Sequence, residues 1–76
     1  MSRITIQIAS DTDYDKLIAE IYIDGDFAGL VSQKGSILRY EIPSADRSIG
    51  MVRSVDLDVL IEALERARQE LNQGSA

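Results

Sequence analysis

The sequence predicts an α+β domain, in which an antiparallel meander of four or five strands is covered on one face by one C-terminal amphipathic helix. Three observations predict it: β-forming runs fill the N-terminal half, turn-forming pairs separate these runs, and a helical apolar period follows near the C-terminus. Short connections favour antiparallel neighbours, because parallel strands need long crossovers. The 76 residues suffice for one domain, 1–76, and we expect residues 73–76 to fray.

The clearest strand signal is a hairpin at residues 17–33, LIAEIYIDGDFAGLVSQ. Two β-rich runs flank Asp24-Gly25, a pair that favours a type I′ turn with positive φ at both central residues. A two-residue loop gives the hairpin two apolar faces. The face toward the helix is predicted to carry Ala19, Ile21, Ile23, Ala28 and Leu30. The opposite face carries Ile18, Tyr22, Phe27 and Val31, and we expect either the 43–54 loop or a partner to cover it.

Three further segments complete the predicted sheet. Residues 4–8 alternate isoleucine with polar residues and form the first strand. Residues 37–42 form another, which Pro43 ends because proline has no amide to donate to a ladder. Residues 49–54 are a candidate edge strand, which leaves the count at four or five.

The helix is expected to begin after Asp56, whose carboxylate suits the N-cap, and to stop near residues 72–74. Its predicted core stripe has helical spacing and consists of Leu57, Leu60, Ile61, Leu64, Ala67 and Leu71.

Composition excludes several classes of function. Thirteen acidic and eight basic residues give a net charge of −5, which disfavours nucleic-acid binding and favours a basic partner, although the same charge also keeps a small domain in solution. The chain has no Cys and no His, and no Gly-rich phosphate loop. We therefore predict that it is not an enzyme and uses no cofactor and no metal. The first three ligand positions of a calcium-binding loop match the spacing of Asp11, Asp13 and Asp15. That loop also needs a glycine and a glutamate, where this chain has Lys16 and Tyr22.

The N-terminal segment alternates in the manner of a strand and lacks the apolar core of a signal peptide. No run of residues is long and apolar enough to span a membrane. We expect a cytoplasmic protein with no membrane partner.

The hairpin KLIAEIYIDGDFAGLVSQ, the strand LRYEIP and the helix VDLDVLIEALERARQEL together resemble the small immunity proteins of bacterial contact-dependent growth inhibition and other polymorphic toxin systems. The resemblance covers residues 14–72 and implies a cytoplasmic antitoxin that binds a cognate toxin domain, often a nuclease, and blocks it. No binding residue carries over, because such proteins vary widely at the surface that binds the toxin.

Surface chemistry supplies the candidate toxin-binding residues. Carboxylates would meet a basic active-site cleft, and aromatic side chains would anchor the contact. The candidates are Asp11, Asp13, Tyr22, Asp24, Asp26 and Phe27. The structural alternative for Tyr22 and Phe27 is a cross-strand pair that only stabilises the sheet.

Two other functions stay open. Three antiparallel strands followed by EALERARQEL also resemble the HicB-type antitoxin domain, although LRYEIPSADRS stands where that family usually has a segment rich in proline and glycine. The third possibility is a self-associating structural module with no toxin, a homodimer formed through the second face of the hairpin.

Overall fold

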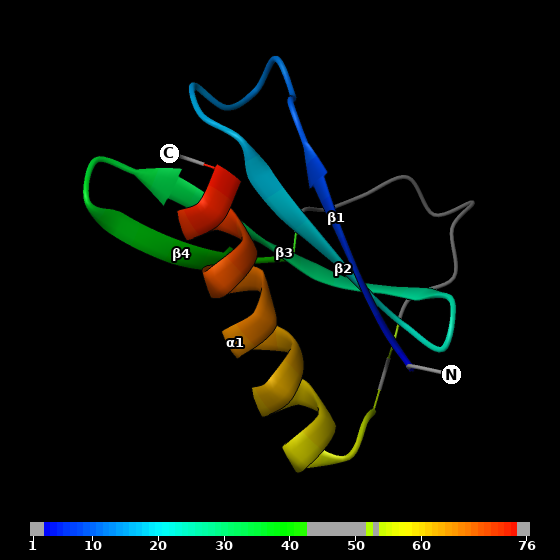
Figure 1. Cartoon of the computed structure of the whole chain (residues 1–76). Helices are drawn as coiled ribbons and strands as arrows, with labels where there is room; N and C mark the ends of the chain where they lie inside the picture. The colour runs from blue at the N-terminus through cyan, green and yellow to red at the C-terminus, as the bar shows by residue number, and fades with distance from the viewer. Residues whose placement is uncertain (1–2, 43–51, 53, 75–76) are drawn as a thin grey trace.

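A computed structural model of the chain shows, in the residues that it describes, four strands and one helix in the predicted order (Figure 1). It describes residues 3–42, 52 and 54–74. The sheet is an antiparallel meander in the order β1-β2-β3-β4, and the helix packs against it, which confirms the predicted fold class. The elements are β1 (Ile4–Ala9), β2 (Ile18–Ile23), β3 (Asp26–Lys34), β4 (Ile37–Glu41) and α1 (Leu57–Gly74).

The candidate strand at residues 49–54 lies mostly outside the described residues. Val52 and Ser54 are described, and neither belongs to a strand. The Val52 amide donates to the Phe27 carbonyl at 2.9 Å, so the chain passes beside the start of β3 before it enters the helix. Asp56 takes the predicted N-cap position, because its carbonyl accepts the first helical hydrogen bond, from the Leu60 amide at 3.1 Å.

Two-residue turns join the strands of both hairpins. Asp24 and Gly25 have φ values of 53° and 89°, as the predicted type I′ turn requires. Gly35 has a φ of 62° at the first central position of the β3–β4 turn, where a type II′ turn takes glycine. The predicted pairing of Tyr22 with Phe27 is confirmed next to the first of these turns.

A β-bulge reverses part of the predicted face assignment. Glu20 pairs with Leu30, so that both Ala28 and Gly29 lie opposite Ile21. Because side chains alternate along a strand, one extra residue moves every later side chain to the other face. The predicted faces of two residues were therefore wrong: Val31 packs in the core under the helix, and Leu30 lies on the opposite face.

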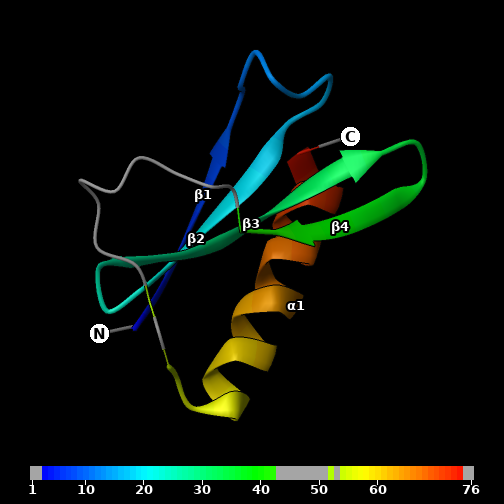
Figure 2. The same cartoon turned by 180° about the vertical axis from the view of Figure 1, so that it is seen from behind.

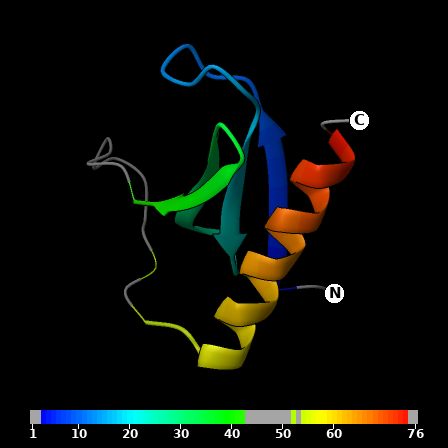
Figure 3. The same cartoon turned by 90° about the vertical axis from the view of Figure 1, so that its left-hand side faces the viewer.

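The helix covers β1 and β2 and reaches β3 only in part, so that β4 lies beside α1 (Figure 3). Its contact face is centred on Ala63, Ala67 and Leu71, all of which are fully buried or nearly so. The predicted stripe was wrong for Leu57 and Ile61, which are 68% and 46% exposed. The core between the helix and the sheet contains Ile4, Ala19, Ile21, Ile23, Ala28, Val31, Ala63, Ala67 and Leu71.

The opposite face of the sheet, which is turned toward the viewer in Figure 2, has a second, smaller apolar cluster. Ile18, Phe27 and Leu30 are buried there, and Ala9, Tyr14 and Tyr22 pack against them. Tyr14 comes from the β1–β2 connector, which folds over this face. The predicted cover by the 43–54 loop concerns residues that lie mostly outside the described part of the chain. In the described part, no helix is long and apolar enough to cross a membrane.

Candidate binding surface

The structure does not bring the four predicted acidic residues together. Asp11 and Asp13 lie in the connector that precedes β2, whereas Asp24 and Asp26 flank Gly25 in the turn that follows it (Figure 1). These two acidic groups therefore lie at opposite ends of the sheet. Each group is exposed, but they cannot contact a partner as one patch.

The acidic end near the β2–β3 turn is organised by Arg3. Its guanidinium lies 2.8 Å from the Asp24 carboxylate and 3.3 Å from that of Asp56, which precedes α1. The backbone also joins here, because the Asp24 amide donates to the Arg3 carbonyl at 2.8 Å. The hydrogen bond from Arg3 holds the pKa of Asp24 below its usual range. Asp24 thus serves first to tie the turn to the N-terminal strand and to the start of the helix.

The acidic connector at the other end is folded by its own side chains. The Asp11 carboxylate accepts a hydrogen bond from the Asp13 amide at 2.8 Å, and its carbonyl accepts one from the Tyr14 amide at 3.0 Å. This turn directs the Tyr14 hydroxyl to Glu41, 3.3 Å away. Burial, and then the charge of Glu41, raise the pKa of Tyr14. The Glu41 carboxylate accepts a second hydrogen bond from the hydroxyl of Ser32, which is buried.

The two aromatic candidates, Tyr22 and Phe27, form a cross-strand pair, which is the predicted alternative to a toxin-binding role. The rings of Tyr22 and Phe27 lie edge to face with centroids 5.7 Å apart. Phe27 is only 8% exposed, so in the free chain it is a core side chain. Tyr22 is half-buried, and this burial raises the pKa of its hydroxyl. The pair therefore stabilises the second apolar cluster of the domain.

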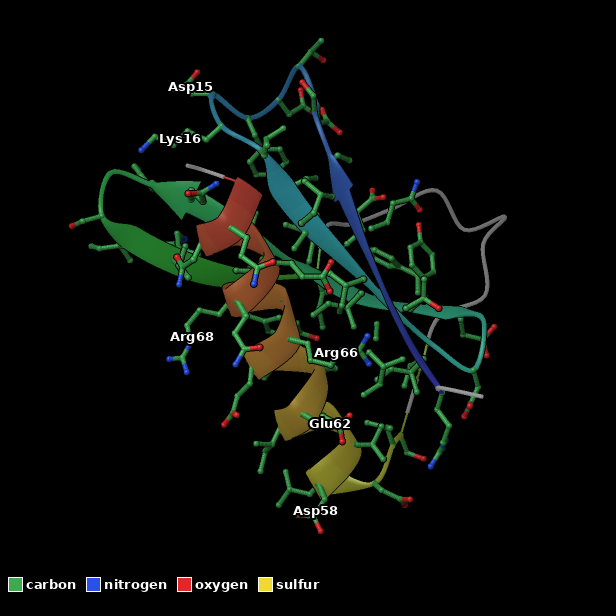
Figure 4. The ribbon with its side chains drawn as sticks, viewed as in Figure 1. Asp15, Lys16, Asp58, Glu62, Arg66 and Arg68 are labelled. Carbon is green, nitrogen blue, oxygen red and sulfur yellow. The ribbon has the colours of Figure 1, made fainter. Side chains whose placement is uncertain are left out.

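A hollow with a mainly apolar lining lies between α1 and β4, and the sequence did not indicate it. We call it the α1–β4 groove; its volume is about 290 Å³. It is lined by Val31, Leu38, Arg39, Tyr40, Leu64, Glu65 and Arg68. Figure 4 shows Arg68 directed toward β4, whereas Glu62 and Arg66 lie on the other side of the helix.

Exposed apolar side chains extend the groove along both of its walls. On the helix, Leu57 and Ile61 precede Leu64 at helical spacing and are exposed. On the sheet, Tyr40 is 46% exposed, and Ile42, two residues further on, is 58% exposed. Such a concentration of exposed apolar surface on a small domain is typical of a contact surface.

The width of a helix explains both the groove and why it was missed. A helix with its side chains is about 10 Å wide, and strands are spaced about 4.8 Å apart, so one helix covers roughly two strands. The sequence predicted four or five strands and a single helix. Counting widths, together with the apolar series Leu38, Tyr40 and Ile42, would have indicated an uncovered strip on the helix side of the sheet.

Among the described residues, no group of three or more acidic side chains is placed to hold a metal ion. No protein-family model matches this chain, and no curated protein or solved structure gives a significant match to it.

Proposed function

We propose that the chain is a non-enzymatic antitoxin of the immunity-protein class, which binds a cognate bacterial toxin domain in the cytoplasm and blocks its active site. The observation that carries the proposal is the α1–β4 groove together with Leu57 and Ile61, which the free domain leaves exposed. In the free domain, leucine and isoleucine at these helical positions bury only part of their apolar surface, whereas in a complex their burial would contribute contact energy.

The groove supplies the anchoring part of the interface. Burying one leucine, isoleucine or aromatic side chain contributes about 1.5–3 kcal/mol. Tyr40 in the groove, with Ile61 and Leu57 further along the same side of the helix, would supply exposed apolar side chains of the kind that dominate protein interfaces. Arg39, Glu65 and Arg68 at its margin would form the polar rim.

The acidic residues have a different role in this proposal. Asp11 and Asp13 at one end and Asp26 at the other, with the net charge of −5, surround the domain with negative potential. This potential would attract a basic toxin, such as a nuclease whose active site accommodates phosphate groups, and would raise the rate of association. The apolar groove would then determine how slowly the complex dissociates.

Co-expression with the protein encoded immediately upstream tests the proposal, because an immunity gene lies beside its toxin gene. The wild-type chain should protect the cell and co-purify with that protein. If the chain gives no protection and forms no complex with that protein, the antitoxin function is refuted.

Substitutions then locate the surface. Ile61→Gln and Leu57→Gln should each weaken the complex by about tenfold or more, because each removes an apolar contact. Glu62→Gln is the matched control on the other side of the helix and should change affinity by less than about twofold (Figure 4). Asp11→Asn with Asp13→Asn should mainly slow association at low salt. If the aspartate variants abolish the complex and the glutamine variants at 57 and 61 do not, the contact lies at an acidic end and not in the groove.

A further inference from the structure

Within the described part of the chain, the outer edge of β4 is a free strand edge with a distinctive sequence. β4 is the last strand of the sheet, and the described residues contain no strand that pairs with its outer side. The two-residue turn makes Lys34 and Ile37 a hydrogen-bonded pair, and such pairs alternate along an antiparallel ladder. The backbone groups of Leu38, Tyr40 and Ile42 therefore point away from β3, toward any strand that is added to this edge.

We propose that two copies of this chain form a homodimer by pairing their β4 strands antiparallel, with the two-fold axis at Tyr40. The two four-stranded sheets then become one continuous sheet. In this register Tyr40 lies opposite Tyr40 of the second copy, Leu38 lies opposite Ile42, and Arg39 lies opposite Glu41. The outward backbone groups of Leu38, Tyr40 and Ile42 fall in the hydrogen-bonded pairs, so every one of them gains a partner.

Charge complementarity selects this register. Arg39 and Glu41 share one face of β4. The two-fold axis therefore creates two identical pairs, in each of which Arg39 of one copy lies opposite Glu41 of the other. These are non-hydrogen-bonded pairs, in which side chains approach most closely, and opposite charges there are favourable. Within the described residues, Arg39 has no carboxylate within 4.0 Å, and Glu41 is held only by the neutral hydroxyls of Tyr14 and Ser32. The dimer would give each of these charges an opposite partner.

The apolar face supports the same register. Tyr40 and Ile42 are exposed in the single chain, and pairing would bring Ile42 against Leu38 on both sides of the central Tyr40 pair. The neighbouring registers are worse. An axis at Arg39 places two arginines opposite each other, and an axis at Leu38 places Arg39 opposite Ile37 and leaves Glu41 without a cation.

The dimer would also join the two α1–β4 grooves. Because α1 lies over β1 and β2, the helices of the two copies would flank the joined β3 and β4 strands and would not cover them. The proposal does not depend on a toxin, since it concerns the edge of the sheet and the purified chain alone.

Charge variants provide the first test, by sedimentation over a concentration series into the high-micromolar range. The wild type should be in monomer–dimer equilibrium. Arg39→Glu should weaken the dimer by about tenfold or more, because attraction becomes repulsion in both pairs. Arg68→Glu makes the same change of charge on the helix wall of the groove, and it should have an effect of less than about twofold.

A mixture gives the sharper result. Arg39→Glu has two acidic edge residues and Glu41→Arg has two basic ones, so each alone should dimerise more weakly than the wild type, while the two together form a heterodimer. A monomeric wild type, or equal weakening by Arg39→Glu and Arg68→Glu, would overturn the proposal.

Glu41→Arg removes the acceptor of the buried Ser32 hydroxyl and can impair folding, so a second measurement leaves Glu41 intact. The chain has no cysteine, so a single introduced thiol can cross-link only to the same position in another copy. Tyr40→Cys should form an intermolecular disulfide rapidly under mild oxidation, because only this position meets itself across the axis. Ile37→Cys, exposed at the start of the same strand, is the control and should cross-link at least about tenfold more slowly. Equal rates, or faster cross-linking at position 37, would refute this register.

Discussion

The ring of Tyr40 lies directly on the α-carbon of Gly29. A β-carbon at position 29 would be 2.7 Å from Cε1 of Tyr40, and the Tyr40 hydroxyl donates to the neighbouring Ala28 carbonyl at 2.6 Å. Gly29 is also the bulge residue and has a φ of 110°, which L side chains rarely adopt. Gly29 thus makes the bulge possible and leaves the space that the Tyr40 ring occupies. The bulge in turn determines which face each later residue of β3 occupies.

Gly29→Ala should lower the free energy of unfolding by about 2–4 kcal/mol, because it combines backbone strain with a collision against Tyr40. Urea denaturation measures this change. In a Tyr40→Ala background the same substitution should cost less, since only the backbone strain remains, and the difference between the two costs is the coupling energy of the pair. Equal costs in both backgrounds would show that the ring does not press on position 29.

The Arg3–Asp24 contact should make stability fall in acid. The pKa of Asp24 is lowered in the folded chain, so its stabilising contribution is present above its ordinary pKa of 3.8 and is lost as the pH falls through the lower folded value. Asp24→Asn keeps the shape and tolerates the positive φ of this position. The variant should therefore lose less free energy of unfolding than the wild type between about pH 6 and pH 3. Urea unfolding at several pH values measures this slope, and Asp26→Asn, which removes a neighbouring exposed carboxylate, serves as the control. A slope as steep in the Asp24 variant as in the wild type would assign the acid sensitivity to other groups.

Because α1 packs on the sheet through Ala63, Ala67 and Leu71, substitutions on its buried face and on its exposed face should change stability by very different amounts. Ala63 is completely buried against the sheet, so Ala63→Leu should destabilise the fold by about 1–3 kcal/mol through overpacking. Leu57→Ala, at a side chain that is 68% exposed, should change stability by less than about 0.5 kcal/mol. Thermal unfolding of the two variants compares them. A larger loss of stability from Leu57→Ala than from Ala63→Leu would instead support the helix contact face that was predicted from the sequence.

The sequence by itself determined the elements of this protein and their order. Period-two alternation located the first and last strands of the sheet, β-rich runs on either side of Asp24-Gly25 located the central hairpin and its type I′ turn, and Asp56 marked the start of the helix. These features depend on local preferences of the chain, which act over a few residues and can be read without knowing what packs against them.

Only the tertiary structure decided which side chains meet. The bulge at Gly29 exchanged the faces of Leu30 and Val31, because alternation along a strand carries any slip forward to all later residues. Hydrophobicity favoured Leu57 and Ile61 for the helix contact, but close packing on the sheet selected the small side chains of Ala63 and Ala67. The apolar residues displaced from that contact line the side of α1 toward β4. The candidate binding surface therefore arises from packing geometry, which a local pattern does not contain.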